Sequence, residues 1–405
     1  MNEFDIAIIG GGPAGLMASV ATCRNSSIAI FEKTDSLGKK LLLTGGGRCN
    51  ITNNTPIRKL LNLFNEKNFL KHSFYTLTNE KLLNIFETKG LEFKEEEDKR
   101  VFPITDDASS VLDILKSYLT DVNIFLNYSV SSIVKHNDKF IINNEFKANK
   151  VIIATGGITY PQTGSSGDGY KLSYNLKQPL SSIKYGLVPL ISDGLEDLAG
   201  TTLYNVIVSY KKFKFSGDVL ISHFGLSGPP ILNISNKISE DVDYDLLNSN
   251  ELDLEDININ IDLVPDFTFE ELNNKFIKDS SLKAKLILKN YLKYYLTSKF
   301  ISFFLDSLDI DNDILMANLT KKDRNKIISS LKGFNFKING FKSKLSKVTI
   351  GGVRIDKINS KTMESTVVNN LYFAGEVLEP AGLSGGFNLK IAFSTGYLAG
   401  LSASK

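Results

Sequence analysis

The sequence is poor in the residue types that build disulfide frameworks and metal centres. Its 405 residues include two cysteines, three histidines and no tryptophan. Two cysteines permit at most one disulfide bridge, and this small inventory argues against a Cys/His metal cluster, so no metal site is predicted. No CxxC or CxxxxC pair is present, which excludes the dithiol mechanism of disulfide reductases. A reducing compartment is the expected environment.

The sequence also lacks a charge excess and a long apolar run. Lys and Arg number 47 against 45 Asp and Glu, so a net charge of +2 provides no global basic field for nucleic acid or membrane. One local basic face would still suffice. No segment reaches the ~20 uncharged apolar residues of a membrane span. The N-terminus starts with an acid and has no basic signal-peptide region. We expect a cytoplasmic protein that binds no membrane.

The N-terminal segment has the order of elements that dinucleotide binding requires. Residues 4–9 predict a strand, GGGPAG at 10–15 follows directly and opens a helix, and residues 28–31 predict a second strand that ends at Glu32. In such a βαβ unit the glycines permit a tight turn, close approach to a pyrophosphate and close helix packing. The helix N-terminus attracts phosphate, and the acid accepts hydrogen bonds from a ribose.

Further glycine-rich segments favour FAD over NAD. ATGG at 154–157 and FAGE at 373–376 each follow an apolar strand, and GLSGG at 382–386 precedes an apolar helix that begins near Phe387. An NAD domain needs only the first glycine motif, whereas FAD also has a ribityl chain and a ring to hold. The N-terminus of the last helix would stabilise an anionic reduced flavin. GSSGDG at 164–169 has no predicted strand or helix beside it, so NAD(P)H is expected to dock only transiently.

Changes in pattern along the chain predict an α/β protein with a discontinuous first domain. A meander of short strands is expected at 123–154, and a strand at 347–355. The segments are a first FAD-binding part at 1–186, a small β domain at 187–265, a helical insert at 266–340, and a return to the FAD-binding domain at 341–405.

Motifs spread along the chain together resemble one enzyme family. They are LLLTGGGRCNITN, RVFPITDDASSVL, ATGGITYPQTGSSGDGY, SHFGLSGPPIL, TIGGVRIDKINSKTMES and LYFAGEVLEPAGLSGGFNLKIAFSTGYLAG. Their content and order resemble the BaiN/YhiN/RdsA family of FAD-dependent oxidoreductases. The resemblance implies a Rossmann-like FAD-binding domain in two segments, a β-barrel-like substrate domain and a helical insert.

The resemblance also carries over a set of residues as FAD contacts. The chain departs from the family's pattern at one place, where Glu379 stands in place of an aspartate and is followed by Pro380. The residues expected to bind the cofactor are Gly10, Gly12, Pro13, Ala14, Gly15, Glu32, Lys33, Lys40, Gly45, Gly46, Gly47, Asn50, Thr155, Gly156, Gly157, Gly375, Glu376, Gly385, Gly386, Phe387 and Asn388.

The resemblance leaves the reaction open. Family members are associated with reduction of uridine to dihydrouridine in large-subunit ribosomal RNA, with ring reduction of bile acids and with oxidation of aminoacetone. The leading prediction is NAD(P)H-driven reduction of a C=C bond, with uridine in 23S ribosomal RNA as substrate. The alternatives are a small-molecule flavoenzyme, either ring reductase or amine oxidase, and an FAD-bound RNA-binding module without turnover.

Three residues are candidates for catalysis. Reduction of an activated C=C bond needs a hydride on one carbon and a proton on its neighbour. Cys49 could supply the proton or simply be a small buried residue. Arg48 could polarise a substrate carbonyl or hold an anionic group. His223, in a glycine-rich turn, could protonate or bind a substrate, or could tie the turn to the β domain.

The helical insert is rich in lysine and could form a phosphate-binding face for RNA, or simply a solvated face. Aromatic residues Tyr291, Phe334 and Phe336 are interleaved with these lysines. The lysines of the insert are Lys283, Lys285, Lys289, Lys293 and Lys299, and further along the chain follow Lys332, Lys337, Lys342, Lys344 and Lys347.

Overall fold

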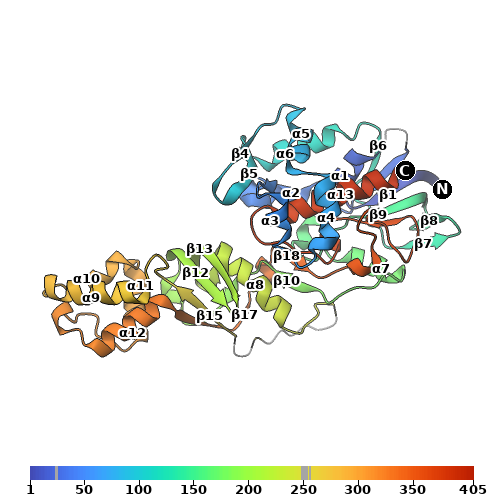
Figure 1. Ribbon diagram of the computed structural model, residues 1–405. Coiled ribbons are helices and arrows are strands. Elements are labelled where there is room, and N and C mark those ends of the chain that lie inside the picture. Colours follow the sequence, from blue (N-terminus) through green and yellow to red (C-terminus); the bar gives the residue numbers. More distant parts are fainter. Residues whose placement is uncertain (23–25, 248–253, 255–256) are drawn as a thin grey trace. The chain divides into compact units, whose positions relative to one another are not determined.

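The computed structural model describes residues 1–22, 26–247, 254 and 257–405. The chain divides into two compact units (Figure 1). The first unit is Met1–Tyr185, Tyr244–Asn248 and Lys347–Lys405, and the second is Gly186–Asp243 and Ser249–Ser346. The chain therefore leaves the first unit, forms the second, and returns to complete the first with its C-terminal segment.

A seven-stranded mixed sheet is the centre of the first unit. Its order is β6-β2-β1-β9-β8-β7, and β19 also pairs with β9. β1, β2, β6, β9 and β19 run parallel, while β7 and β8 extend the sheet antiparallel. The strands are β1 (Asn2–Ile9), β2 (Ile28–Phe31), β6 (Val122–Phe125), β7 (Ile133–His136), β8 (Lys139–Ile142), β9 (Phe146–Ile153) and β19 (Leu371–Phe373). β2 and the end of β9 are buried throughout, as their continuous apolar sequence requires.

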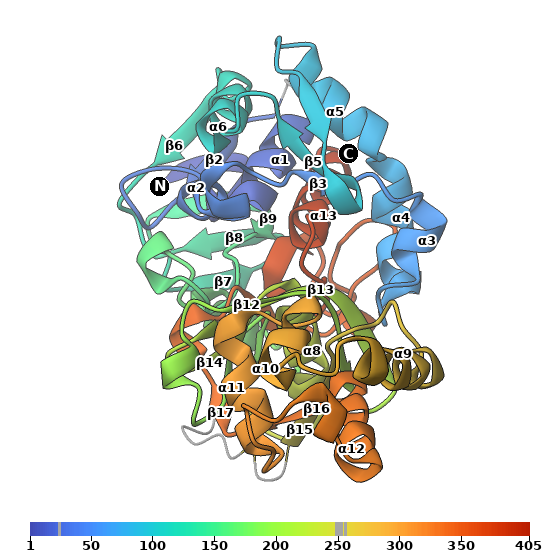
Figure 2. The same cartoon turned by 90° about the vertical axis from the view of Figure 1, so that its left-hand side faces the viewer.

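Two helices of the first unit, α1 and α13, pack with their backbones close together (Figures 1 and 2). A Cβ atom at Gly396 would lie 2.2 Å from the carbonyl oxygen of Ala14, and one at Gly400 would lie 2.0 Å from that of Ala18. Both glycines are therefore needed for this close packing. The helices of the unit are α1 (Pro13–Ala21), α2 (Lys39–Leu42), α3 (Ile57–Leu61), α4 (Lys67–Thr76), α5 (Asn79–Glu87), α6 (Ala108–Ser117), α7 (Asp168–Asn175) and α13 (Phe387–Ala403).

The structure corrects three local expectations in this unit. The meander expected at 123–154 is wrong for β6, which pairs parallel with β2. A helix does follow GSSGDG, because α7 begins at Asp168 after Gly167, whose φ of +81° suits only glycine well. The strand expected at 347–355 is limited to β18 (Val348–Ile350), because Gly351 and Gly352 turn the backbone away with φ of +84° and +145°.

A small antiparallel sheet, β3-β5-β4, also belongs to the first unit. Its strands are β3 (Thr52–Asn53), β4 (Phe93–Glu95) and β5 (Arg100–Pro103), and a further short strand, β10 (Lys184–Gly186), ends at the boundary between the units. β3 begins at Thr52, shortly after the glycine-rich segment at 45–47, so this sheet holds the chain that leaves that segment.

The second unit contains an antiparallel sheet that curls round on itself. The order is β16-β15-β12-β13-β14-β11-β17, and its two end strands are separated in sequence only by Asn339. Because the first and last strands are joined by one residue, the sheet must bend into a barrel-like form. The strands are β11 (Leu190–Ile191), β12 (Thr202–Tyr210), β13 (Phe213–Ser222), β14 (Gly225–Ser227), β15 (Ile257–Asp262), β16 (Phe334–Ile338) and β17 (Gly340–Phe341).

The helices of the second unit are α8 (Pro229–Asp241), α9 (Phe269–Leu282), α10 (Leu288–Tyr291), α11 (Ser298–Ser307) and α12 (Lys321–Lys332). α9 begins with a capping box between Thr268 and Glu271. The insert has its own core, in which Phe276, Tyr291 and Phe300 are 0% exposed. No helix in the described part of the chain is both long and apolar enough to cross a membrane.

Candidate functional site

A pocket lies in the first unit where parallel strands β1, β2, β6 and β9 end. It encloses about 1240 Å³ of empty space, part of it open to solvent. Such a position, at the carboxyl ends of strands in a parallel sheet, is where α/β proteins bind ligands. The residues expected to bind cofactor that line it are Gly10, Gly12, Pro13, Ala14, Glu32, Lys33, Lys40, Thr155, Gly156, Glu376 and Asn388.

The glycines at 10–15 shape the pocket by close approach of the backbone. A Cβ at Gly10 would lie 2.5 Å from the carbonyl oxygen of Ala154, and one at Gly15 would lie 2.0 Å from that of Gly10. Gly12 differs, since a Cβ there would have none of the described atoms within 4 Å. α1 starts at Pro13, so its free N–H groups are presented at this opening.

The carboxylate of Glu32 is held in place by two backbone N–H groups. Oε2 accepts a hydrogen bond of 2.9 Å from Gly11, and Oε1 accepts one of 2.8 Å from Thr34. The residue is 8% exposed. Its position at the end of β2, fixed by backbone donors, suits a group that accepts hydrogen bonds from ribose hydroxyls.

A charged pair joins the end of β2 to the start of α7. The ammonium of Lys33 donates to the Asp168 carboxylate and to the hydroxyl of Ser166. Burial of Asp168 opposes its ionisation, but the hydrogen bonds from Lys33 and Ser166 outweigh it and lower the pKa of this carboxyl. Both charged residues line the pocket.

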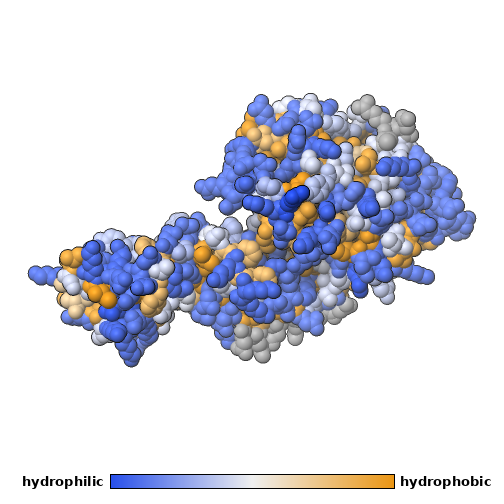
Figure 3. All heavy atoms as spheres, viewed as in Figure 1, coloured by the Kyte–Doolittle hydropathy of each residue, from blue (hydrophilic) through white to orange (hydrophobic). Residues whose placement is uncertain are grey.

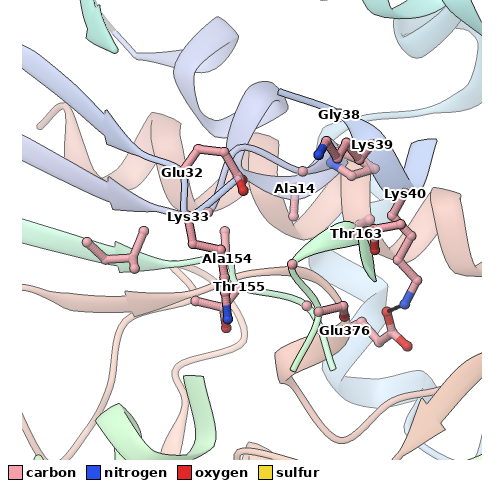
Figure 4. Close-up of a pocket in the computed structure, with 18 of the residues that line it drawn as sticks. Ala14, Glu32, Lys33, Gly38, Lys39, Lys40, Ala154, Thr155, Thr163 and Glu376 are labelled. Carbon is pink, nitrogen blue, oxygen red and sulfur yellow. Dashed lines mark hydrogen bonds and ion pairs between the residues drawn. The ribbon is translucent and has the colours of Figure 1, made fainter. Parts of the chain in front are cut away.

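A second charged pair connects α2 with the segment that follows β19 (Figure 4). Lys40 Nζ lies 2.5 Å from Glu376 Oε2 and donates to Thr159 Oγ1 at 2.8 Å. Glu376 Oε1 also accepts from the backbone N–H of Thr349 at 2.8 Å. Burial raises the pKa of the Tyr160 hydroxyl, and the carboxylate of Glu376 raises it further. The pair therefore places fixed charges of both signs in the pocket wall.

The residues present fit FAD. The opening at Gly12 and the N-terminus of α1 suit a pyrophosphate, and Glu32 suits a ribose. The buried Oγ1 of Thr155, in the pocket lining, has no hydrogen-bond partner in the described residues, which a bound ligand would supply. Bound FAD would supply the redox chemistry, and the chain would supply binding, orientation and charge.

The glycine-rich segment at 45–47 lies beside the pocket, which its neighbour Thr44 lines. Its three glycines have φ of +59°, +69° and +91°, a region that other residues rarely adopt. They are not part of the pocket lining in the structure. Their contact with flavin stays a prediction.

Arg48 is bound to carboxylates of two loops beside the small sheet, Glu96 after β4 and Asp106 after β5. Its guanidinium lies 2.8 Å from Glu96 and 3.3 Å from Asp106, and 4.1 Å above the ring of Phe102. The hydrogen bond with Glu96 raises the pKa of Arg48. In this arrangement Arg48 fastens the glycine-rich segment to the sheet, and its predicted action on substrate would require release from these partners.

Cys49 is completely buried, with 0% of the residue exposed and a φ of +62°. Burial raises the pKa of its thiol to about 12, and a hydrogen bond with Thr44 only partly opposes the shift. The thiol therefore carries its proton at neutral pH, as a proton donor must, but it lies outside the pocket lining. Its catalytic role stays a prediction that requires exposure.

Other residues expected to bind cofactor support the pocket wall from behind. Gly375 donates its N–H to Thr395 Oγ1, and a Cβ there would lie 2.7 Å from the Cβ of Ala14. A Cβ at Gly386 would lie 2.6 Å from the carbonyl oxygen of Thr52. Those outside the lining are Gly15, Gly45, Gly46, Gly47, Asn50, Gly157, Gly375, Gly385, Gly386 and Phe387.

His223 lies in the second unit, in the turn between β13 and β14. Its ring packs edge-on against Phe224 with 5.1 Å between the ring centres. This contact tests neither its predicted action on a substrate nor its predicted role in tying the turn to the β domain, so both stay predictions. Glu379, where the chain departs from the family pattern, accepts a hydrogen bond from the N–H of Ile355, and Pro380 lines the pocket.

Sequence reasoning missed several residues of the pocket lining. Tyr128, Ser129 and Val130 follow β6, and the expectation of a meander hid that this strand ends at the site. Ser165 and Asp168 belong to the GSSGDG segment and could have been found from its glycines.

Known proteins match this chain over nearly its whole length. The sequence profile of the HI0933-like protein Rossmann domain matches residues 4–402. The chain is 30% identical to a ribosomal RNA dihydrouridine synthase of Haemophilus influenzae, over 98% of each chain. It is 28% identical to a 3-dehydro-bile acid delta(4,6)-reductase of Clostridium scindens, over 99% of each.

A solved structure shares the fold. The 3-ketosteroid-delta4-(5alpha)-dehydrogenase of Rhodococcus jostii superimposes with a TM-score of 0.50 at 12% identity, covering 100% of this chain and 97% of that one. The fold, the glycine-lined pocket and the whole-chain match agree. The chain therefore belongs to the HI0933-like Rossmann-domain family, which includes the BaiN, YhiN and RdsA proteins, and it is an FAD-dependent oxidoreductase.

Proposed function

We propose that this protein reduces the C5=C6 bond of a uridine in 23S ribosomal RNA to give dihydrouridine. The observation that carries the proposal is the match over 98% of each chain to a protein named ribosomal RNA dihydrouridine synthase. A second such synthase, from Escherichia coli, is 28% identical over 98% of this chain. The similarity to these two relatives thus covers the second unit as well as the pocket residues.

The charges of the pocket suit the proposed reaction. Lys40 and Lys33, each paired with a carboxylate, place cations in its wall, where negative charge on a bound cofactor or substrate would be stabilised. NAD(P)H is the proposed reductant, and it would dock transiently. RNA as substrate places the proposed activity in the cytoplasm.

The test is the dihydrouridine content of ribosomal RNA with and without the gene. Mass spectrometry of nucleosides from a deletion strain should show a lower dihydrouridine content in 23S RNA, restored by the wild-type chain. A chain with Gly12→Ala, whose new methyl enters the pocket, should not restore it. Unchanged dihydrouridine in the deletion strain would overturn the substrate assignment.

Ring reduction of a small molecule is the second candidate. It is supported by the 28% identity to the bile-acid reductase of Clostridium scindens over 99% of both chains. The purified flavoprotein should then oxidise NAD(P)H in the presence of an unsaturated 3-ketosteroid. Oxidation with RNA but not with the steroid would exclude this candidate.

Cys49 is the proposed proton donor, with Arg48 and His223 as further candidates for acting on the substrate. Cys49→Ala should then keep FAD bound and lose turnover, because the hydride acceptor would lack its proton. Full activity in this variant would leave Cys49 as a packing residue. The same assay on Arg48→Gln and His223→Gln would show whether either group acts on substrate.

A further inference from the structure

A second cavity lies within the second unit, and none of the residues assigned to the cofactor lines it. It encloses about 950 Å³, part of it open to solvent, between β12 and the segment that joins α10 to α11. Three tyrosines line it together with polar groups, and the residues used below are Tyr204, Lys293, Tyr294, Tyr295 and Thr297.

Two of these tyrosines expose most of their surface. Tyr204 is 66% exposed and Tyr294 is 65% exposed, and both residues line the cavity. The aromatic residues that the sequence interleaves with these lysines lie in the core, since Tyr291, Phe334 and Phe336 are 0%, 7% and 3% exposed. These three rings are therefore not available for stacking on RNA.

β12 is irregular beside Tyr204. The pairing of β12 with β13 shifts register between Leu203 and Val206, and Asn205 has a φ of +53°. The N–H of Asn205 donates to the Asp218 carboxylate, which stabilises the bulge. A bulge redirects the side chains beside it and is common next to functional sites.

The segment around Tyr294 carries a local excess of positive charge. Residues 280–305 contain five lysines and no Asp or Glu, whereas the whole chain is almost neutral. Lys283 Nζ lies 4.4 Å above the ring of Tyr294 and 4.0 Å from Asp279. For Lys285, Lys289 and Lys293, no carboxylate of the described residues lies within ion-pairing distance. The surface of the insert is largely hydrophilic with small apolar areas (Figure 3).

We propose that this cavity binds an unpaired nucleobase of RNA, stacked on Tyr294 and Tyr204, with the neighbouring lysines binding phosphates. The inference rests on the proposed function, in which RNA is the substrate. Exposed aromatic rings beside unpaired lysines are the combination that binds single-stranded RNA, because every base has a face to stack and every linkage a charge. The buried Oγ1 of Thr297, without a partner in the described part of the chain, adds a polar group to the same cavity.

Binding of a fluorescein-labelled, uridine-rich single-stranded RNA to the full FAD-loaded chain tests the proposal. Tyr294→Ala and Tyr204→Ala should each weaken binding about fivefold or more, as loss of one stacked base predicts. Tyr174→Ala is the matched control, because Tyr174 is 74% exposed and belongs to the first unit. The control should bind as the wild type does. Equal affinity in all four chains, or a weakening in Tyr174→Ala of the same size, would overturn the proposal.

A substitution that keeps an aromatic ring separates stacking from misfolding. The chain has no tryptophan, so Tyr294→Trp introduces a single fluorescent reporter. This variant should retain wild-type affinity, and RNA should quench its fluorescence as a base stacks on the indole. Retained affinity without quenching would show that the RNA binds elsewhere. A chain that binds no RNA but forms dimers through this face would also overturn the proposal.

The test of this site and the test of the proposed function can fail independently of each other. If dihydrouridine in cells depends on the gene but RNA affinity is unaffected by Tyr204→Ala and Tyr294→Ala, this site falls and the reaction stands. If RNA binding requires the tyrosines but dihydrouridine does not depend on the gene, the reaction falls and the site stands.

Discussion

Two glycine-rich segments of the first unit, residues 10–15 and residues 45–47, contain glycines that are needed for different physical reasons. At Gly15 a Cβ would collide with the backbone, 2.0 Å from a carbonyl oxygen, while the local φ is ordinary. At Gly46 there is open space within 4 Å among the described residues, but φ is +69°. Gly15 is therefore needed for close packing, whereas Gly46 is needed for a left-handed turn.

The charged neighbours of the two segments differ in the same way. Glu32 is held by backbone N–H groups at the pocket wall. Arg48 is held by carboxylates outside the pocket lining. Similar sequence composition therefore occurs in two settings, one at the pocket wall and one in a loop fastened by ion pairs.

The largest expected effect is that of Gly15→Ala. Its methyl group meets backbone atoms that cannot move independently, so we expect a loss of about 3 kcal/mol in the free energy of unfolding and loss of FAD. Gly12→Ala is the matched variant, because its Cβ has space and should leave stability nearly unchanged while weakening FAD binding. Thermal unfolding and flavin absorbance measure both. Equal stability in the two variants would contradict the packing explanation.

Glu32→Gln should weaken FAD binding about tenfold or more, because a charged acceptor of hydrogen bonds is replaced by an amide. Titration of the apoprotein with FAD measures the dissociation constant. Arg48→Gln serves as the comparison and should change that constant less, because its partners lie outside the pocket lining. A larger effect from Arg48→Gln would place the second segment at the cofactor.

The stability of the fold should depend on pH through Cys49. Its pKa is raised from 9.0 to about 12 in the folded chain, so above pH 9 the unfolded chain releases a proton that the folded chain retains. The contribution is therefore complete below pH 9 and decreases above it, by about 1.4 kcal/mol at pH 10.

Denaturant unfolding at pH 8 and pH 10 measures this loss as the difference between the wild type and Cys49→Ala. Groups other than Cys49 titrate alike in both chains, so their contributions to the unfolding free energy cancel in this difference. A difference that stays constant with pH would show that the thiol ionises in the folded state, and so reaches solvent.

Gly46→Ala should have the smallest effect, about 1 kcal/mol of unfolding free energy, because only the left-handed backbone is strained. Gly46→Asn should lose less, since asparagine tolerates this conformation. Both chains should keep their FAD. Loss of FAD from these variants would show that the second segment contacts the cofactor, as the family resemblance implies, and would make the two segments alike.

Prediction from sequence succeeded where an element depends on residues close together in the chain. Strand, glycine turn, helix and second strand at 4–32 form one βαβ unit, as expected. Eleven of the residues expected to bind cofactor line one pocket, and their contact with FAD stays a prediction. Prediction failed where long-range pairing decides, as for β6, which pairs with β2 and brings Tyr128 to the pocket. The burial of the aromatic residues in the insert likewise depends on packing that the sequence does not show.

The sequence by itself determined the fold class, the cofactor and the family, because glycines at fixed offsets and continuous apolar strands act locally. Only the tertiary structure decided that Arg48 binds Glu96 and Asp106, that Cys49 is buried, and that Tyr204 and Tyr294 are exposed. Burial and ion pairing depend on segments far apart in the chain, and no short sequence pattern contains both partners.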